Sequence, residues 1–524
     1  MKSVMKHQFS QVPRVSIPRS TFDRSHGHKT TFDAGYLIPV FADEALPGDT
    51  FNLSMTAFSR MSTPIFPVMD NLYMDSFFFA VPLRLIWDNF QRFMGEQTDP
   101  GDSTDYLIPT MESPASTGYE PGTLSDYLGI PSGVPELEHT SLFHRAYNLI
   151  YNEWFRDQNL QDSVTVDKDD GPDDDTDYEI LRRGKRHDYF TSALPWPQKG
   201  EAVVLPMGES APIAVDQNPG GNIGIFSVSQ DAYHEMDSDQ AKVDVSAGVV
   251  TAATSMYADL TDATTVTINQ LRQSFQIQKL LERDARGGTR YTEIVKSHFG
   301  VTSPDSRLQR PEYLGGGSTP ININPVVATA TSVFPVTPYQ TMSRVGETGA
   351  YSTTAIKSNG FTKSFTEHCV IIGMVSVRAD LTYQQGLNKM FSRSTRYDMY
   401  WPSLAHIGEQ SILNKEIYAQ GAGNPSEDEE VFGYQERYAE YRYKPSIISG
   451  EFRSSVSGSL DAWHLSQEFG SLPTLGATFI EETPPMDRIL AVDSEPDFIF
   501  DSYFRMKCAR PMPVYGVPGM IDHF

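Results

Sequence analysis

The segment from Val68 to Gly95 constrains the fold of this chain more than any other stretch. Residues 71 to 80 alternate with the two-residue period of a strand, and both faces are apolar enough to be mostly buried. Pro82 ends the strand pattern and suits a first helical turn. Apolar residues then recur at helical spacing, at Leu83, Trp87, Phe90 and Met94. Such a strand needs partners on both sides.

Three further strand patterns lie far from this one in the chain. Residues 51 to 57 alternate, and residues 365 to 381 carry a near-continuous apolar run long enough to span a sheet. Residues 498 to 508 show the cleanest alternation, with Phe498, Phe500, Phe504, Met506 and Cys508 on one face and Asp501, Tyr503, Arg505 and Lys507 on the other. Strands drawn from both ends of a 524-residue chain predict one antiparallel sandwich closed late, with insertions between its strands. Several unrelated small β domains are the alternative, but no flexible linker of the usual composition divides the chain.

Composition is that of a folded, acidic protein. The chain has 30 Phe, 25 Tyr and 35 Pro, enough aromatic surface for a large core and enough proline for long loops. A net charge of -25 argues against nucleic-acid binding along the whole chain. Cys369 and Cys508 both fall in strand patterns, so we expect reduced core thiols formed in a reducing cytoplasm. We expect neither secretion nor membrane insertion, since Met1 to His7 are not an apolar signal region and no run of 18 apolar residues follows.

Residues 1–30 read as a basic arm on this acidic protein. Its bases are Lys2, Lys6, Arg14, Arg19, Arg24 and Lys29, against the single acid Asp23. Pro13 and Pro18 predict an extended arm that lies along a neighbouring subunit or along phosphate, with a frayed terminus as the alternative. His26 and His28 have no third ligand nearby, so we predict no metal there.

Helical and loop patterns fill the long insertions. Apolar residues at helical spacing between 142 and 155 predict a packing helix, and a second helical pattern runs from 267 to 298 with a capping box at Thr267 and Gln270. In the second, Leu271, Phe275 and Leu281 supply the apolar face, and Gly287-Gly288 breaks the helix. We read residues 315 to 318, Gly-Gly-Gly-Ser, as a flexible loop and residues 427 to 430 as an exposed acidic turn.

Long motifs along the chain resemble one family. They are Pro18 to Gly27, Lys29 to Phe32, Ala34 to Pro39, Pro82 to Trp87, Phe93 to Gly95, Tyr189 to Gly200, Glu282 to Tyr291, Gln309 to Gly316, Gly433 to Pro445, Ala509 to Tyr515, Val517 to Gly519 and Ile521 to Phe524. Together they resemble the major capsid protein of gokushoviruses, small single-stranded DNA phages of the Microviridae. The resemblance covers nearly the whole chain and weakens between about residues 201 and 265.

The resemblance implies a fold and an assembly. The fold is all-β, a single eight-stranded antiparallel jelly roll with large loop and short-helix insertions. Sixty copies form a T=1 icosahedral shell around circular single-stranded DNA. The implied partners are other copies of the chain, the genome, a small basic DNA-binding protein, minor virion proteins and a host cell-surface receptor. The implied location is the virion, assembled in the cytoplasm of a bacterial host, with no enzymatic activity and no cofactor.

A β-sandwich glycan-binding protein or glycosidase is the alternative function, because sandwiches host both and carboxylates are plentiful here. The sequence has no G-x-S-x-G, no H-E-x-x-H and no phosphate loop. Glycosidase carboxylates, however, keep no fixed spacing. Particle size separates the two classes: a coat protein sediments as a megadalton particle, whereas a glycosidase hydrolyses oligosaccharides as a monomer.

Two charge clusters follow the first helical pattern. Acids crowd around Gly171-Pro172, at Asp167, Asp169, Asp170, Asp173, Asp174, Asp175, Asp177 and Glu179. They are too many to bury and predict a solvated loop, with a calcium site as a weaker alternative because the spacing does not match an EF-hand. Bases follow at once, at Arg182, Arg183, Lys185 and Arg186. Such a cluster pairs with nearby acids or a neighbouring subunit, and exposure to packaged DNA is the alternative.

These features divide the chain into four parts: the basic arm 1–30, the first part of the jelly roll 31–200, a variable acidic insertion 201–265, and 266–524 with the helical insertion, the remaining strands and an extended tail. The insertion stands where the family carries a threefold protrusion that meets the host. We predict that DNA is faced by Lys2, Lys6, Arg14, Arg19, Arg24, Arg182, Arg183, Lys185 and Arg186. We predict that a neighbouring subunit is contacted by Pro511, Pro513, Tyr515, Pro518 and Phe524.

Overall fold

The structure is a computed structural model that divides into two compact units, Met1–Pro197 with Thr289–Phe524, and Gln198–Gly288. It describes residues 18–201, 203, 213–215, 224–227, 231–239, 242–249, 256–258, 268–302, 304–305, 309–336, 339–343, 345–380, 382–492 and 494–515.

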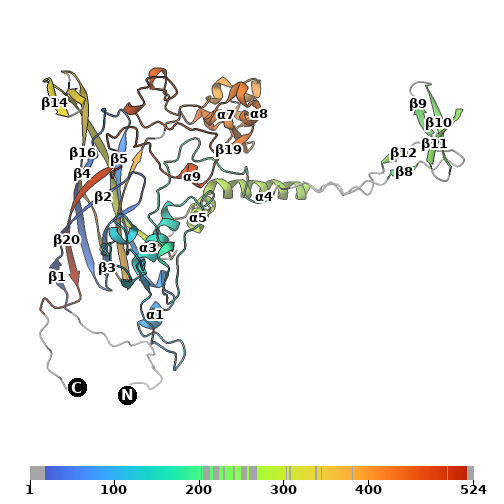
Figure 1. Cartoon of the computed structure of the whole chain (residues 1–524). Coiled ribbons are helices and arrows are strands. Elements are labelled where there is room, and N and C mark those ends of the chain that lie inside the picture. The colour runs from blue at the N-terminus through green and yellow to red at the C-terminus, as the bar shows by residue number, and fades with distance from the viewer. Residues whose placement is uncertain are drawn as a thin grey trace, which may run out of the picture. The chain divides into compact units, whose positions relative to one another are not determined.

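A nine-stranded antiparallel sheet forms the frame of the larger unit (Figure 1). Its strands are β1 (Ser20–Asp23), β2 (His26–Phe32), β3 (Ile38–Ala45), β4 (Thr50–Met61), β5 (Leu72–Pro82), β13 (Glu312–Val327), β16 (Thr348–Ser364), β17 (Cys369–Ala379) and β20 (Phe498–Arg510). We call the neighbours β2, β20, β4 and β16 half-sheet A, and the neighbours β13, β5, β17 and β3 half-sheet B. Pairing of β16 with β13 joins the two, and β1 extends the edge beside β2 along β20.

This strand order is that of a jelly roll. Each half contains four strands, neighbours in space come from distant parts of the chain, and the last strand, β20, lies between the early strands β2 and β4. The predicted eight-stranded antiparallel jelly roll with insertions is therefore confirmed, with β1 as a short ninth strand.

The core lies between the two halves. Inward side chains of β20 and β4 meet those of β5, β17 and β3 in one continuous cluster. Phe504 of β20 lies 5.2 Å, centroid to centroid, from Phe41 of β3, and Phe361 of β16 lies 5.6 Å from Phe78 of β5. Both cysteines, Cys369 and Cys508, are buried and free, as predicted.

Half-sheet B is buried on its second face as well. The helix α3 (Leu142–Ile150) and the π-helical turn Tyr151–Phe155 pack on β5 and β17 (Figure 1). Phe79 and Ile372 of these strands belong to the apolar cluster on this side and not to the sandwich core. The apolar stripe predicted to pack therefore does so, and it explains why β5 and β17 are apolar on both faces. The expected helix after Pro82 is a 3-10 turn, Leu83–Leu85, followed by the four-residue α1 (Phe90–Phe93).

One predicted loop is a strand. Gly315, Gly316 and Gly317 lie within β13, paired with β5. A Cβ on Gly316 would overlap the carbonyl oxygen of Ser76, and a Cβ on Gly315 would overlap that of Gly360. Glycine is needed here because the neighbouring backbones approach too closely to leave room for a side chain. The prediction was wrong because it took a run of glycines as the sign of a loop.

The loops after β5, β13 and β17 carry the shorter elements of the larger unit. These are β6 (Thr110–Glu112) with β7 (Glu138–Thr140), α2 (Leu124–Tyr127), α5 (Tyr291–Phe299), β14 (Ser332–Val336) with β15 (Tyr339–Ser343), β18 (Glu409–Leu413) with β19 (Val431–Glu436), α7 (Asn414–Ile417), α8 (Pro425–Asp428) and α9 (Ala477–Ile480). The acidic turn predicted to be exposed includes Asp428, which is buried and accepts hydrogen bonds from the N–H groups of Gln420 and Gly421. Only part of that turn is therefore solvated.

The smaller unit has its own strands. A three-stranded antiparallel sheet joins β9 (Gly224–Ser227), β10 (Ala232–Asp239) and β11 (Lys242–Val249), and β8 (Ile213–Val215) pairs with β12 (Met256–Ala258). Helix α4 (Ile268–Gly287) ends at the predicted break, while the capping residue Thr267 lies outside the described residues. Phe275, which we predicted to supply a packing face, is exposed within its own chain.

No helix in the described part of the chain is both long and apolar enough to cross a membrane.

Candidate functional site

A buried ion pair links the acidic loop to α3, which with the turn Tyr151–Phe155 covers the second face of half-sheet B. We call these covering elements the cover of half-sheet B. The Arg145 side chain on α3 is 0% exposed and that of Asp173 is 1% exposed. Arg145 Nε donates to Asp173 Oδ2 at 2.7 Å, its Nη2 pairs with Oδ1, and the Tyr178 hydroxyl donates to Oδ2 at 2.6 Å. Arg145 Nη1 also donates to the carbonyl oxygen of Ile86 at 3.1 Å. Sequence reasoning missed this pair, since it counted the carboxylates as solvated and took the helix stripe as apolar only.

The rest of the acidic loop is part structural and part solvated. Asp170 Oδ1 accepts a hydrogen bond from Trp87 Nε1 at 2.7 Å, whereas the Asp169 side chain is 78% exposed. Within the described residues, no group of three or more His, Cys, Asp or Glu side chains forms a possible metal site, so the calcium alternative gains no support.

Three side chains of the basic cluster at 182–186 have partners inside the fold. The Arg182 guanidinium lies 3.9 Å from the Tyr36 ring centroid and donates to the carbonyl oxygen of Glu482 at 3.1 Å. Arg183 pairs with the buried Asp75. Lys185 is buried, and its Nζ donates to the carbonyl oxygen of Phe479 at 2.6 Å.

Burial lowers the pKa of Lys185 to about 8, because desolvation disfavours the charged amine. Arg186 is the most exposed of the four and lies 3.9 Å from Asp380. These contacts show the pairing that we expected of the cluster, and they leave Arg186 as its best placed residue for an external phosphate. Contact with DNA stays a prediction for all four.

The basic arm is shorter than its predicted range. From Ser20 onward the predicted arm forms the strands β1 and β2, and both strands pair with β20. Arg24 makes two hydrogen bonds to Asp43, at 2.6 and 3.0 Å, and Arg19 Nη2 donates to Thr50 Oγ1 at 2.7 Å. Lys2, Lys6 and Arg14 lie outside the described residues.

The tail after β20 presents apolar and aromatic surface. Met512, Val514 and Tyr515 are exposed, Tyr515 by 83%, and Pro511 lies against Gly48. Pro518 and Phe524 lie outside the described residues. Subunit contact by the tail stays a prediction.

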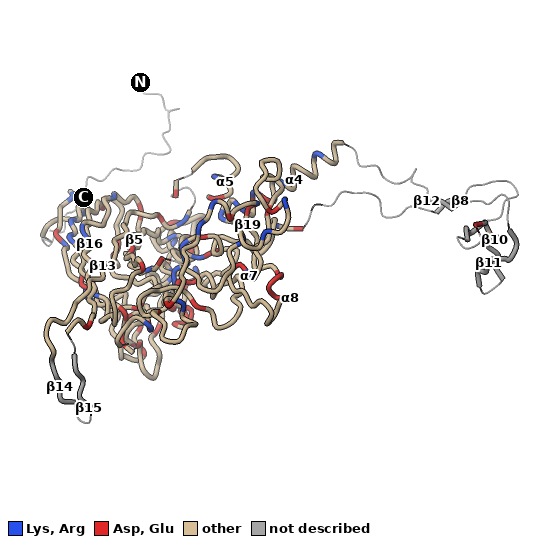
Figure 2. Tube along the Cα trace, turned by 90° about the horizontal axis from the view of Figure 1, so that it is seen from above, with Lys and Arg blue, Asp and Glu red and all other residues tan. Residues whose placement is uncertain are grey.

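Half-sheet A displays a group of cations, of which the sequence analysis assigned only Lys29 to a feature, the basic arm. Lys29, Arg60, Lys357, Arg505 and Lys507 are exposed on its strands. Figure 2 shows Lys and Arg gathered beside β16 at this surface. The signal was present, since Arg505 and Lys507 occupy the outward positions of the cleanest alternation in the chain.

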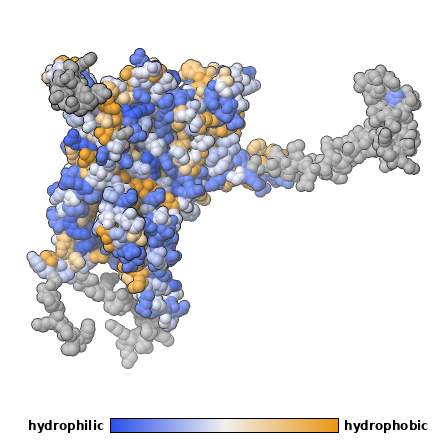
Figure 3. All heavy atoms as spheres, viewed as in Figure 1, coloured by the Kyte–Doolittle hydropathy of each residue, from blue (hydrophilic) through white to orange (hydrophobic). Residues whose placement is uncertain are grey.

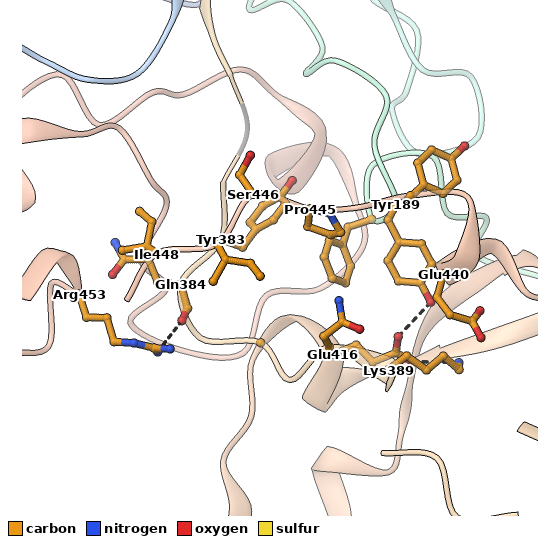
Figure 4. Close-up of a pocket in the computed structure, with 15 residues that line it drawn as sticks. Tyr189, Tyr383, Gln384, Lys389, Glu416, Glu440, Pro445, Ser446, Ile448 and Arg453 are labelled. Atoms are coloured by element: carbon orange, nitrogen blue, oxygen red, sulfur yellow. Dashed lines mark hydrogen bonds and ion pairs between the residues drawn. The ribbon is translucent and has the colours of Figure 1, made fainter. Parts of the chain in front are cut away.

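A pocket of about 100 Å³ lies among the loops that follow β17 (Figure 4). Its two carboxylates are held by cations. Glu416 accepts from the Tyr189 hydroxyl at 2.9 Å and pairs with Lys389 Nζ at 3.1 Å. Glu440 pairs with Arg393 at 3.4 Å. A glycosidase needs one free nucleophile or base and one protonated acid. Both carboxylates here are neutralised within the fold, so the pocket supports a structural role for them.

Comparison with known proteins gives a family for the whole chain. A family model described as capsid protein (F protein) matches residues 10–520. The chain is 49% identical to the capsid protein VP1 of Bdellovibrio phage phiMH2K, over 99% of this chain and 98% of that protein. It is 42% identical to the capsid protein VP1 of Chlamydia phage 1, over 99% and 98% of the two chains. It is 37% identical to the capsid protein VP1 of Spiroplasma virus 4, over 98% and 97%.

Proposed function

Because the chain belongs to the capsid protein (F protein) family, we propose that it is the structural major capsid protein of a gokushovirus-type phage and that its copies build a closed shell. The observation that carries this proposal is the full-length match to the capsid proteins VP1, whose lengths are covered almost completely. The jelly-roll strand order agrees with it, since such double sheets build many viral shells.

The shell that we propose has sixty copies in T=1 icosahedral order and encloses circular single-stranded DNA. A small basic DNA-binding protein and minor virion proteins complete the particle, which is assembled in the bacterial cytoplasm. We place the basic arm on the inside of the shell, facing the DNA. A protein of net charge -25 must concentrate its basic residues locally to bind a polyanion, and the arm is such a concentration.

Neighbouring copies need contact surfaces, and the larger unit offers them. Figure 3 shows small groups of hydrophobic residues on a largely hydrophilic face. Exposed large apolar side chains lie along the loop after β17, at Phe391, Met399, Tyr400, Trp401 and Ile407, and in the tail at Val514 and Tyr515. Apolar and aromatic surface of this kind is typical of association sites.

The smaller unit is our candidate for host attachment. It is compact in itself, it contains its own sheets, and residues 201–265 are strongly acidic, which suits a surface turned away from packaged DNA. We expect that replacing residues 209–262 with a short Gly-Ser linker leaves shell assembly intact and abolishes adsorption to the host. Normal adsorption of the shortened phage would assign recognition to another part of the capsid.

Assembly itself is tested with the full-length chain, by sedimentation velocity and electron microscopy of the purified protein. We expect megadalton closed shells from the full chain. Truncation after Arg510 is expected to leave a soluble protein that forms no closed shells. This cut keeps Arg510, whose Nε lies 3.0 Å from the buried Asp49, so the loss is not due to damage to β20. A full-length chain that remains a monomer and hydrolyses oligosaccharides would overturn the proposal in favour of a glycosidase.

A further inference from the structure

The outward face of half-sheet A is bare, aromatic and cationic. Along β20 the side chains alternate strictly between buried and exposed from Phe498 to Cys508. The outward positions of β20 lie opposite outward positions of β4, with Tyr503 opposite Thr56, Arg505 opposite Ser54 and Lys507 opposite Asn52. The outward row of β20 thus lies beside that of β4 over the length of the strands.

Two neighbouring aromatic side chains stand on β4 and β20 of this face where polar residues are expected, and Tyr351 of β16 is a third exposed ring on half-sheet A. Tyr503 is 54% exposed and Phe58 is 48% exposed. Phe58 lies opposite Asp501, two positions along β20 from Tyr503, so the two rings are diagonal neighbours on one face. An outward sheet face is normally polar, and two exposed rings on it offer flat surfaces to a ligand.

The cationic side chains around these rings have hydrogen-bond donors that are not used within the fold. Among the described residues, the side chains of Arg60, Lys357, Arg505 and Lys507 make no hydrogen bond or ion pair. Lys29 Nζ lies 3.6 Å from Asp501, and both side chains are more than half exposed. Asp23, opposite Lys507, has its pKa lowered by hydrogen bonds from Ser25 and further by the charges of Lys507 and Arg505. Five cations and these two acids leave the face positive on a protein of net charge -25.

We propose that this face, centred on Tyr503 and Phe58, binds single-stranded DNA. The proposal rests on the function proposed above and names the part of the chain that holds the packaged genome. Non-specific single-strand binding combines cations that track the phosphates with aromatic rings on which bases stack. A four-stranded sheet with outward aromatics is a known platform for such stacking. The rings supply the stacking surface, and Arg60, Arg505 and Lys507 supply the phosphate contacts.

A second copy of the chain is the other occupant to consider, and the composition of the face argues against it. Cores of protein interfaces are depleted in Lys and other charged residues because burial strips their water. Here the cations flank the rings on the same strands, with Arg60 at the next outward position after Phe58 and Arg505 at the next outward position after Tyr503. Phosphates satisfy such cations individually, which an apolar protein surface cannot do.

The test measures binding of a fluorescein-labelled 30-mer of oligothymidylate to the full-length protein by fluorescence anisotropy across a salt series. We expect the triple variant Arg60→Gln, Arg505→Gln, Lys507→Gln to weaken binding about tenfold or more at 0.1 M salt. We expect the slope of log affinity against log salt to fall by about 2 units, since each lost phosphate contact removes about 0.7 on a single strand. We expect the double variant Tyr503→Ser, Phe58→Ser to weaken binding about thirtyfold or more with the slope unchanged.

The control is the double variant Tyr291→Ser, Lys296→Gln on α5, where Tyr291 is 71% exposed. We expect wild-type binding from it. Thermal unfolding of every variant checks that the outward substitutions leave the fold intact, and sedimentation shows whether shells form. Unchanged oligonucleotide affinity in both test variants overturns the proposal, and lost assembly with unchanged affinity assigns the face to a neighbouring copy. Neither result affects the proposed capsid function, which fails only if the wild-type chain forms no shells.

Discussion

The two halves of the jelly roll share one core and differ on their other faces. In half-sheet B the outward residue Ile372 of β17 is 0% exposed, because α3 and its neighbours cover it. In half-sheet A the outward residue Ile499 of β20 is 58% exposed. Insertions between β5 and β13 provide the cover of half-sheet B, whereas half-sheet A presents its strands directly to its surroundings.

This difference separates stability from interaction. A face covered by its own chain contributes to folding, so its residues are chosen for packing and for paired charges such as Arg145 with Asp173. A solvent-exposed face contributes little to folding, and exposed rings and unpaired cations on such a face indicate a binding site. Both faces of half-sheet B therefore contribute to the stability of the subunit, whereas the outward face of half-sheet A is free to bind a partner.

The largest expected effect comes from breaking the ion pair that holds the cover. Asp173→Asn leaves the Arg145 guanidinium buried without its main counter-charge, so we expect a loss of about 3–5 kcal/mol in the free energy of unfolding. Asp169→Asn is the matched control, since Asp169 also lies 3.3 Å from Arg145 but its side chain is 78% exposed. Its expected cost is at most about 1 kcal/mol. Thermal and denaturant unfolding measure both, and equal costs would show that the pair does not secure the cover.

A matched pair of isoleucines compares the two outward faces directly. Ile372→Ala opens a cavity between β17 and α3, and we expect a loss of about 2–5 kcal/mol. Ile499→Ala changes a solvent-exposed position, and we expect a change within about 0.5 kcal/mol. Denaturant unfolding of the two variants gives the answer. A large loss in soluble Ile499→Ala subunits would mean that half-sheet A is covered within its own chain.

Acid is expected to weaken the covered half. His144 on α3 is buried, with Nε2 2.9 Å from Ser125 Oγ, and the Asp173 carboxylate and the His139 ring also face it. Burial, helped by His139, lowers the pKa of His144 from 6.5 to about 3, so the folded state holds it neutral. The stability from neutral His144 is fully present above about pH 6.5 and is lost as pH falls toward 3, at about 1.4 kcal/mol per unit.

His144→Gln keeps a hydrogen-bonding side chain that does not titrate in this range. We expect its unfolding free energy to depend less on pH between 6.5 and 5 than that of the wild type. His26→Gln, an exposed position on half-sheet A, is the control and is expected to keep the wild-type profile. Parallel profiles for wild type and His144→Gln would contradict the prediction.

The smallest expected effect concerns the pairing of β13 with β5 inside half-sheet B. Gly316→Ala forces a Cβ against the Ser76 carbonyl oxygen, so we expect a loss of about 1–3 kcal/mol from strain between β13 and β5. Gly349→Ala in β16 is the control, because no atom lies within 4 Å of the position that its Cβ would take. We expect the control to be neutral within about 0.5 kcal/mol. Equal unfolding free energies for the two variants would show that β13 and β5 can move apart to accommodate the added methyl group at no cost.

The sequence alone determined much of this protein. Periodicity placed β5, β17 and β20 and gave them their buried faces, because a strand's side chains alternate whatever surrounds it. Long motifs identified the capsid family, which the full-length comparisons confirm. The apolar stripe of α3 predicted packing, and the packing is observed.

Only the tertiary structure decided which charges are used and which are free. Asp173 and Lys185 look like surface residues in a charged stretch, but contacts with Arg145 and with the backbone of Phe479 bury them. Gly316 looks like a loop residue, but a neighbouring strand lies against it. Arg505 becomes part of a cationic face because β20 pairs with β4, from the other end of the chain. Such contacts join residues far apart in sequence, and local patterns carry no information about them.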